Sequence, residues 1–165
     1  MRWIIDGMNV IGSRPDGWWR DRAAARRRLL REVAGVLDRL EAADPHSGTA
    51  PCEPELGPRD GTVVVVVFDG RHRADEVAAG AEAGLEVVFA PGGPNAADRV
   101  IAVLVRDAPR PVRTVVVTSD RALADQVRAI GATVVGPREL RALMATTSAA
   151  PLPNKQLGQG RTKRE

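Results

Sequence analysis

The chain has 165 residues, of which 44% are hydrophobic and 27% are charged, so its length favours one domain with a single buried core. Only 3% of the residues are aromatic and none is tyrosine, which argues against a sheet that binds RNA through aromatic side chains. The net charge of +3 lies entirely in segment 154–165, so any affinity for nucleic acid must come from local basic patches.

The first element expected along the chain is a strand at Trp3–Ile5, and further apolar runs follow it. Most of these runs are continuous and rich in β-branched residues. The other predicted strands are Val63–Phe68, Leu85–Phe89, Thr114–Val117 and Thr133–Val135. Continuous apolar strands with helical segments between them are typical of a mainly parallel sheet covered on both faces. We therefore predict an α/β fold.

Helical periodicity appears in the segments between and after these strands. The predicted helices are Asp21–Leu40, Ala74–Ala83, Asn95–Asp107, Arg121–Ile130 and Pro137–Met144. The first is the clearest, because its apolar residues from Leu29 to Leu40 recur at helical spacing. The same stripe, extended backwards, passes through Arg22 and Arg26.

Two segments lack the composition of a packed core. Residues 42–61 hold several prolines and glycines, which predicts a flexible insertion. Residues 146–165 combine small and polar residues with a basic end, which predicts a disordered tail. We therefore place the compact domain at residues 1–145.

Targeting signals and sulfur or histidine metal sites find no support in the sequence. Asp6 comes too early for the apolar region of a signal peptide, and no apolar run has transmembrane length. We expect a cytoplasmic protein with no membrane partner. Cys52 is the only cysteine, and His46 and His72 lie far apart, so a disulfide framework and a zinc site are both unsupported. A bound metal would need oxygen ligands.

Four aspartates stand at the ends of predicted strands or at the start of a predicted helix. Asp6 ends the first strand, Asp69 ends the second, Asp120 follows the fourth, and Asp98 lies in the first turn of the helix after the third. Carboxyl ends of parallel strands meet at one edge, so we expect all four to converge there. Each alone has an ordinary role in a turn or helix cap. Together they repel one another unless a cation compensates, which favours Mg²⁺ or Mn²⁺.

A hard cation held by carboxylates activates water and stabilises the charge on a phosphodiester under attack, so phosphoryl hydrolysis is the expected chemistry. The only lysines, Lys155 and Lys163, lie in the tail. A P-loop is therefore excluded, and sites like those of haloacid dehalogenases or receiver domains lack their usual lysine. The dehalogenase pattern also needs an aspartate at Met8, and no Rossmann glycine fingerprint follows the first strand.

Four motifs occur in order along the chain: Ile4–Ile11, Val67–Gly70, Asn95–Asp98 and Val117–Asp120. Together they resemble the YacP-like group of NYN domains, relatives of the PIN nucleases, over residues 2–143. The resemblance implies a PIN-like three-layer α/β/α fold. It also implies a metal-dependent endoribonuclease that hydrolyses phosphodiester bonds in cellular RNA and leaves a 5′-phosphate and a 3′-hydroxyl.

The same resemblance implies roles for individual residues. Asp6, Asp98 and Asp120 would bind the metal or activate water, and Asp69 would complete the catalytic acidic set, either as a fourth ligand or as an acid beside the ligands. Three polar side chains are expected to orient these carboxylates. They are Asn9, Thr118 and Ser119.

Arginines near the same edge are the candidate RNA contacts. A crossover helix runs antiparallel to the strands, so we expect Arg22 and Arg26 to face the carboxylates. Arg71 and Arg73 follow the second strand, and Arg121 follows Asp120. A guanidinium binds phosphate through paired hydrogen bonds, so we predict that these five contact the RNA backbone.

Some alternatives stay open at this point. Trp18 and Trp19 either stack unpaired bases or pack a loop onto its helix, and we favour packing. A ribosome or another ribonucleoprotein is a possible partner. A noncatalytic RNA-binding protein with the same fold is the main rival function. A metal-dependent phosphatase or DNA nuclease is the third.

Overall fold

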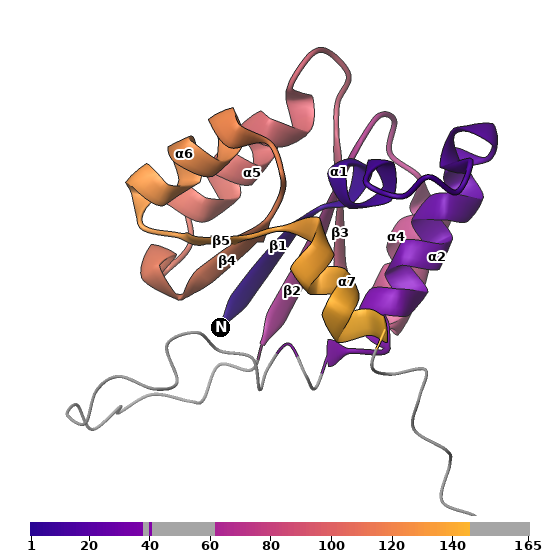
Figure 1. Ribbon diagram of the computed structural model, residues 1–165, viewed down its shortest axis with the longest axis horizontal. Coiled ribbons are helices and arrows are strands. Elements are labelled where there is room, and N and C mark those ends of the chain that lie inside the picture. Colours follow the sequence, from indigo (N-terminus) through magenta and orange to yellow (C-terminus); the bar gives the residue numbers. More distant parts are fainter. Residues whose placement is uncertain (38–39, 41–61, 146–165) are drawn as a thin grey trace, which may run out of the picture.

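The computed structural model describes residues 1–37, 40 and 62–145, so the predicted insertion and tail lie outside the described residues (Figure 1). A five-stranded parallel sheet in the order β3-β2-β1-β4-β5 forms its centre. The strands are β1 (Arg2–Asp6), β2 (Val63–Asp69), β3 (Glu86–Ala90), β4 (Thr114–Val117) and β5 (Thr133–Val135). The predicted α/β class and parallel sheet are confirmed.

Helices cover both faces of the sheet, as the three-layer prediction requires (Figure 1). One face carries α1 (Gly7–Gly12), α2 (Arg22–Ala34), α4 (Ala74–Glu82) and α7 (Pro137–Ala145). The other face carries α5 (Ala96–Arg106) and α6 (Arg121–Ile130). The 3₁₀ helices η1 (Trp18–Arg20) and η2 (Pro111–Arg113) precede α2 and β4. Among the described residues, no helix is both long and apolar enough to span a bilayer.

Successive strand residues enter two separate cores. Ile5 of β1 and Val66 of β2 lie in the core that α2 covers, whereas Ile4 and Val65 lie in the core that α5 covers. All four side chains are fully buried. A strand buried on both faces needs an apolar residue at every position, which explains the continuous valine run of β2.

Two local features differ from the sequence predictions. The helix predicted to run to Leu40 is interrupted, because α2 ends at Ala34 and residues 35 and 36 form a turn before Leu37 and Leu40, which are again helical. The backbone N–H of Gly35 caps the last carbonyls of α2. The sequence did not predict α1, because its six residues are too few for a periodic pattern. A Cβ on Gly7 would lie 2.3 Å from Cε1 of Phe68. Close packing therefore requires glycine at the start of α1, where the sequence indicated only a turn.

Candidate active site

The register of β1 and β2 aims two aspartates at the same face of the sheet. Asp6 pairs with Val67, and Asp69 lies two residues further along β2. Because side chains alternate along a strand, both carboxylates belong to the face that holds Ile4 and Val67. This is the face that α5 covers, and Asp98 stands in the first turn of α5.

The ends of β1 and β4 meet at the point where the strand order reverses. Since β1 lies between β2 and β4, this is the switch point where open α/β sheets bind ligands. There Thr118 donates its hydroxyl hydrogen to Oδ2 of Asp6 at 3.1 Å. The backbone N–H and the hydroxyl of Ser119 both donate to Oδ1 of Asn9, at 2.9 and 2.8 Å. The structure thus brings the three predicted orienting residues together beside Asp6.

Three of the carboxylates also cap helices. Asp6 and Asp120 are the N-caps of α1 and α6, and one oxygen of each accepts a backbone N–H of the first turn at 3.2 and 2.9 Å. Asn95, at the N-cap of α5, has a left-handed φ of 56° and makes no side-chain capping bond. Asp69 caps α5 instead, because its Oδ1 accepts the backbone N–H of Ala97 in the first turn at 3.1 Å. One oxygen of each of these three carboxylates is therefore held in place by a backbone amide.

Burial and mutual repulsion raise the pKa of two carboxyl groups. The side chain of Asp6 is buried, and burial raises its pKa from the ordinary 3.8 to about 6 despite two hydrogen bonds that oppose the change. The charges of Asp98 and Asp69 contribute to this increase. The pKa of Asp98 is also raised, first by burial and then by the charges of Asp120 and Asp69. Asp69 and Asp120 therefore lie close enough for their charges to act on the ionisation of Asp6 or Asp98.

By donor type and charge, these residues fit a hard divalent cation. Among the described residues, however, no three histidine, cysteine, aspartate or glutamate side chains form a group that could hold a metal ion as they stand. Within that same part of the chain, the side chain of Asp98 makes no hydrogen bond or ion pair. Mg²⁺ and Mn²⁺ bind oxygen donors, and a bound cation would offset the mutual repulsion of these carboxylates. The site is thus chemically suited to such an ion but not preassembled.

Three of the predicted RNA-contacting arginines lie free at this edge. Arg71 and Arg73 are exposed in the loop after β2, and Arg121 is exposed at the first position of α6. None of them forms an ion pair with another described residue. Their guanidinium groups are therefore available to a phosphate backbone.

The other two arginines differ from the prediction that they face the carboxylates, because α2 covers the opposite face of the sheet. Arg26 is only 8% exposed and donates to both carboxylate oxygens of Glu76, at 2.6 and 3.0 Å. Its guanidinium also lies 5.9 Å from the ring centre of Phe68. Arg26 cannot reach RNA in this arrangement. Arg22 is exposed, and its guanidinium lies 5.7 Å from the ring centre of Trp18.

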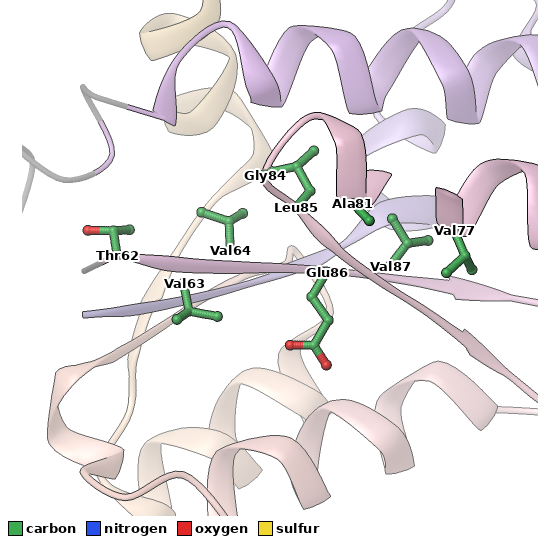
Figure 2. A pocket seen from close by; sticks show the side chains of 9 residues that line it. All are labelled: Thr62, Val63, Val64, Val77, Ala81, Gly84, Leu85, Glu86 and Val87. Atoms are coloured by element: carbon green, nitrogen blue, oxygen red, sulfur yellow. The ribbon is translucent and has the colours of Figure 1, made fainter. Parts of the chain in front are cut away.

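An apolar hollow of about 420 Å³ lies elsewhere, at the amino ends of β2 and β3 beside α4 (Figure 2). Its lining consists of Thr62, Val63, Val64, Val77, Ala81, Gly84, Leu85, Glu86 and Val87. Figure 2 shows Val63 and Glu86 pointing to the opposite face of the sheet from Val64 and Val87. Because the hollow lies at the amino ends of these strands, it is at the opposite edge of the sheet from the aspartates, and none of them lines it.

The parallel sheet carries an aspartate on its central strand to the switch point, beside the N-termini of α5 and α6, which is where open α/β domains bind their ligands. The chain is similar to two crystal structures of Rae1 (YacP) from Bacillus subtilis. One, a mutant form, has a TM-score of 0.60 and 21% identity over 89% of this chain and 76% of that chain. The other has a TM-score of 0.56 and 22% identity over 90% and 75%. This likeness shows the fold.

No curated protein sequence matches the chain. The family model described as the YacP-like NYN domain matches residues 57–164, so the chain belongs to this family of PIN-like nucleases. The match includes Asp69, Asp98 and Asp120 but begins after Asp6. Asp6 is instead tied to the site by its hydrogen bond with Thr118.

Proposed function

We propose that this chain is a metal-dependent endoribonuclease that hydrolyses phosphodiester bonds of RNA. The observation that carries the proposal is the convergence of four carboxylates at the switch point of the sheet, where burial and mutual repulsion raise the pKa of Asp6 and Asp98. Membership of a PIN-like nuclease family supports hydrolysis of a nucleic acid. The YacP-like motifs support RNA as the substrate.

In this proposal Asp6, Asp98 and Asp120 hold Mg²⁺ or Mn²⁺, and Asp69 completes the catalytic acidic set. The bound cation supplies activation of water and stabilisation of charge on the phosphate. Asp6 is held by its two hydrogen bonds, so its carboxylate keeps one orientation. Asp98 makes no hydrogen bond to the rest of the described chain, so it is the carboxylate most free to turn toward a cation.

The neighbouring polar residues act as positioning residues. Thr118 accepts the backbone N–H of Asp120 at 3.1 Å while donating to Asp6, so one hydroxyl links the carboxylate of Asp6 to the backbone of Asp120. Asn9 and Ser119 join the segment after β1 to the segment after β4. We expect these bonds to fix the spacing of the acidic set when RNA binds.

The RNA backbone would follow the exposed cations at the same edge. Arg71, Arg73 and Arg121 are exposed there, and Arg22 lies at the start of α2. Guanidinium groups contact phosphates regardless of sequence, so these residues contribute affinity and not base preference. A ribosome or another ribonucleoprotein could present the RNA to this edge.

The proposal is tested by cleavage of a labelled RNA with Mg²⁺ or Mn²⁺ and with EDTA. Asp98→Asn should lower the rate by more than about 100-fold, because it removes a charge at the proposed metal site. The matched control is Asp107→Asn, which makes the same substitution just beyond the other end of α5, where Asp107 is exposed and pairs with Arg106. That control should cleave normally, and EDTA should stop cleavage by both proteins.

Parallel substrates separate the alternative functions. Single-stranded DNA and a phosphate monoester test the DNA nuclease and the phosphatase. The same RNA bound to ribosomes tests whether a ribonucleoprotein presents the substrate. Binding of RNA without cleavage under every condition would refute the nuclease and favour a noncatalytic RNA-binding protein. Unchanged cleavage by Asp98→Asn would refute the metal site.

A further inference from the structure

The segment that joins α1 to α2 carries two tryptophans with different environments. Trp18 is half-buried and packs against the core under α2, whereas Trp19 is 58% exposed. The two rings meet edge to face, with centroids 6.3 Å apart and planes at 82°. The packing interpretation therefore holds for Trp18. Trp19 is held by its neighbour and presents much of its ring to solvent.

Two arginines follow this exposed ring closely in the chain, and the guanidinium of one of them, Arg22, lies 5.7 Å from the ring centre of Trp18. Arg20 and Arg22 are exposed, and Arg20 forms no ion pair with any described residue. The nearby acidic groups are engaged elsewhere. Asp21 accepts the N–H of Ala24 as the N-cap of α2, and Asp16 is held by an arginine of that helix. The surface around Trp19 thus combines an aromatic face with guanidinium groups that lack carboxylate partners.

The segment that joins α1 to α2 lies at the same end of the molecule as the carboxyl end of β1, and α1 leads from that strand end to it (Figure 1). The helix α1 begins after its cap, Asp6, and ends at Gly12. A Cβ on Gly12 would lie 3.7 Å from Cζ2 of Trp18. Six helical residues rise about 9 Å. Trp18 is therefore about one short helix away from Asp6, and the ring of Trp19 lies beside it.

We propose that Trp19 is a stacking site for an unpaired base of a single-stranded RNA, with Arg20 and Arg22 binding the adjacent phosphates. The identity of the ligand rests on the function proposed above. Aromatic rings bind bases of any sequence by stacking, and the cations beside them hold the backbone. An apolar protein partner would use the ring but would leave the two arginines without a counter-charge. The site would hold the strand beside the carboxylates without selecting its sequence.

Binding is measured in EDTA, so that cleavage does not interfere, by anisotropy of a labelled oligouridylate and of an abasic strand of equal length. Wild type should bind the strand with bases about 10-fold more tightly than the abasic strand, the scale of one stacked base. Trp19→Ala should remove this preference, and Trp19→Phe should keep most of it. Val112→Ala should not change it, because Val112 is equally exposed at 59% but lies in η2 at the opposite edge.

Cleavage kinetics distinguish this inference from the proposed function. With Mg²⁺ or Mn²⁺, Trp19→Ala should raise KM about 10-fold and leave kcat nearly unchanged, because stacking holds the strand away from the reacting bond. Cleavage with an unchanged KM and an unchanged base preference would overturn the stacking site and leave the nuclease intact. A base preference that depends on Trp19, without any cleavage, would support the stacking site and refute the nuclease. Equal affinity of wild type for both strands would overturn the stacking site, since only phosphates would then be recognised.

Discussion

Asp6→Asn should stabilise the fold at neutral pH while abolishing cleavage. Asp6 is 5% exposed, and burial raises its pKa from 3.8 to about 6. Its ionised form is therefore disfavoured in the folded protein. Asparagine has nearly the same shape and no charge. Its side-chain oxygen can still accept the N–H of Asn9 that caps α1.

The size and sign of the effect follow from proton linkage. A pKa raised from 3.8 to about 6 means that ionising Asp6 costs about 3 kcal/mol more in the folded protein than in the unfolded chain. The stability due to protonated Asp6 is fully present below pH 3.8 and is lost as the pH rises through about 6. About 1.5 kcal/mol of this loss falls between pH 5 and pH 8. Asparagine does not ionise, so the variant should gain that amount relative to wild type.

Thermal unfolding of both proteins in EDTA between pH 5 and pH 8 measures this gain. The difference in Tm should grow by about 3–6 °C over that range. The side-chain amide that Asp6→Asn introduces would contact Thr118 and so change the Tm of the variant. This change would be the same at every pH. The control is Asp21→Asn, since asparagine is an equally good N-cap at that exposed position and Asp21 lies outside the carboxylate cluster. A Tm difference that is constant or shrinks with pH would refute the buried charge. Added Mg²⁺ should raise the Tm of wild type more than that of Asp6→Asn.

Two further predictions concern the packing beside the site, both read from urea unfolding. Gly7→Ala should lower the free energy of unfolding by about 1–3 kcal/mol, because its Cβ would meet Phe68 at 2.3 Å. Gly12→Ala, at the other end of α1, would meet its nearest atom at 3.7 Å and should change the free energy of unfolding very little. Equal losses in the two variants would contradict the packing argument. Arg26→Met should cost about 3–5 kcal/mol because it leaves the carboxylate of Glu76 buried and unpaired, and adding Glu76→Leu should recover most of that loss. A double variant no more stable than the single one would show that the pair contributes through more than its charges.

The layers of the fold could be predicted from the sequence because the pattern of apolar residues indicates which segments form strands and helices. Continuous runs such as Val63–Phe68 are apolar on both faces, which only a doubly covered sheet explains. The helix α1 has no such signal, because Gly7–Gly12 is shorter than two turns. Its existence depends on tertiary contacts, above all the close approach of Gly7 to Phe68.

The gathering of the aspartates at the carboxyl ends of the strands could also be predicted, because the position of an aspartate relative to a strand end can be read from the sequence. The surroundings of Arg22 and Arg26 could not be predicted, because the sequence does not indicate which face of the sheet their helix covers. Arg26 lies within the apolar stripe of α2, and an arginine in such a stripe indicates a buried partner. That partner, Glu76, lies on α4, fifty residues later in the chain. Nothing in the local sequence connects the two.

The two buried carboxylates of the described chain differ in how their charge is balanced. Glu76 is 1% exposed and receives two hydrogen bonds from a buried arginine. Asp6 is nearly as buried, yet within the described residues no cationic side chain pairs with it, and the charges that affect its pKa are those of other aspartates. A buried charge without a partner costs several kcal/mol. The fold neutralises one carboxylate internally and leaves the other, at the switch point, without a cationic partner among the described residues. In the proposed function, a bound Mg²⁺ or Mn²⁺ would supply that positive charge.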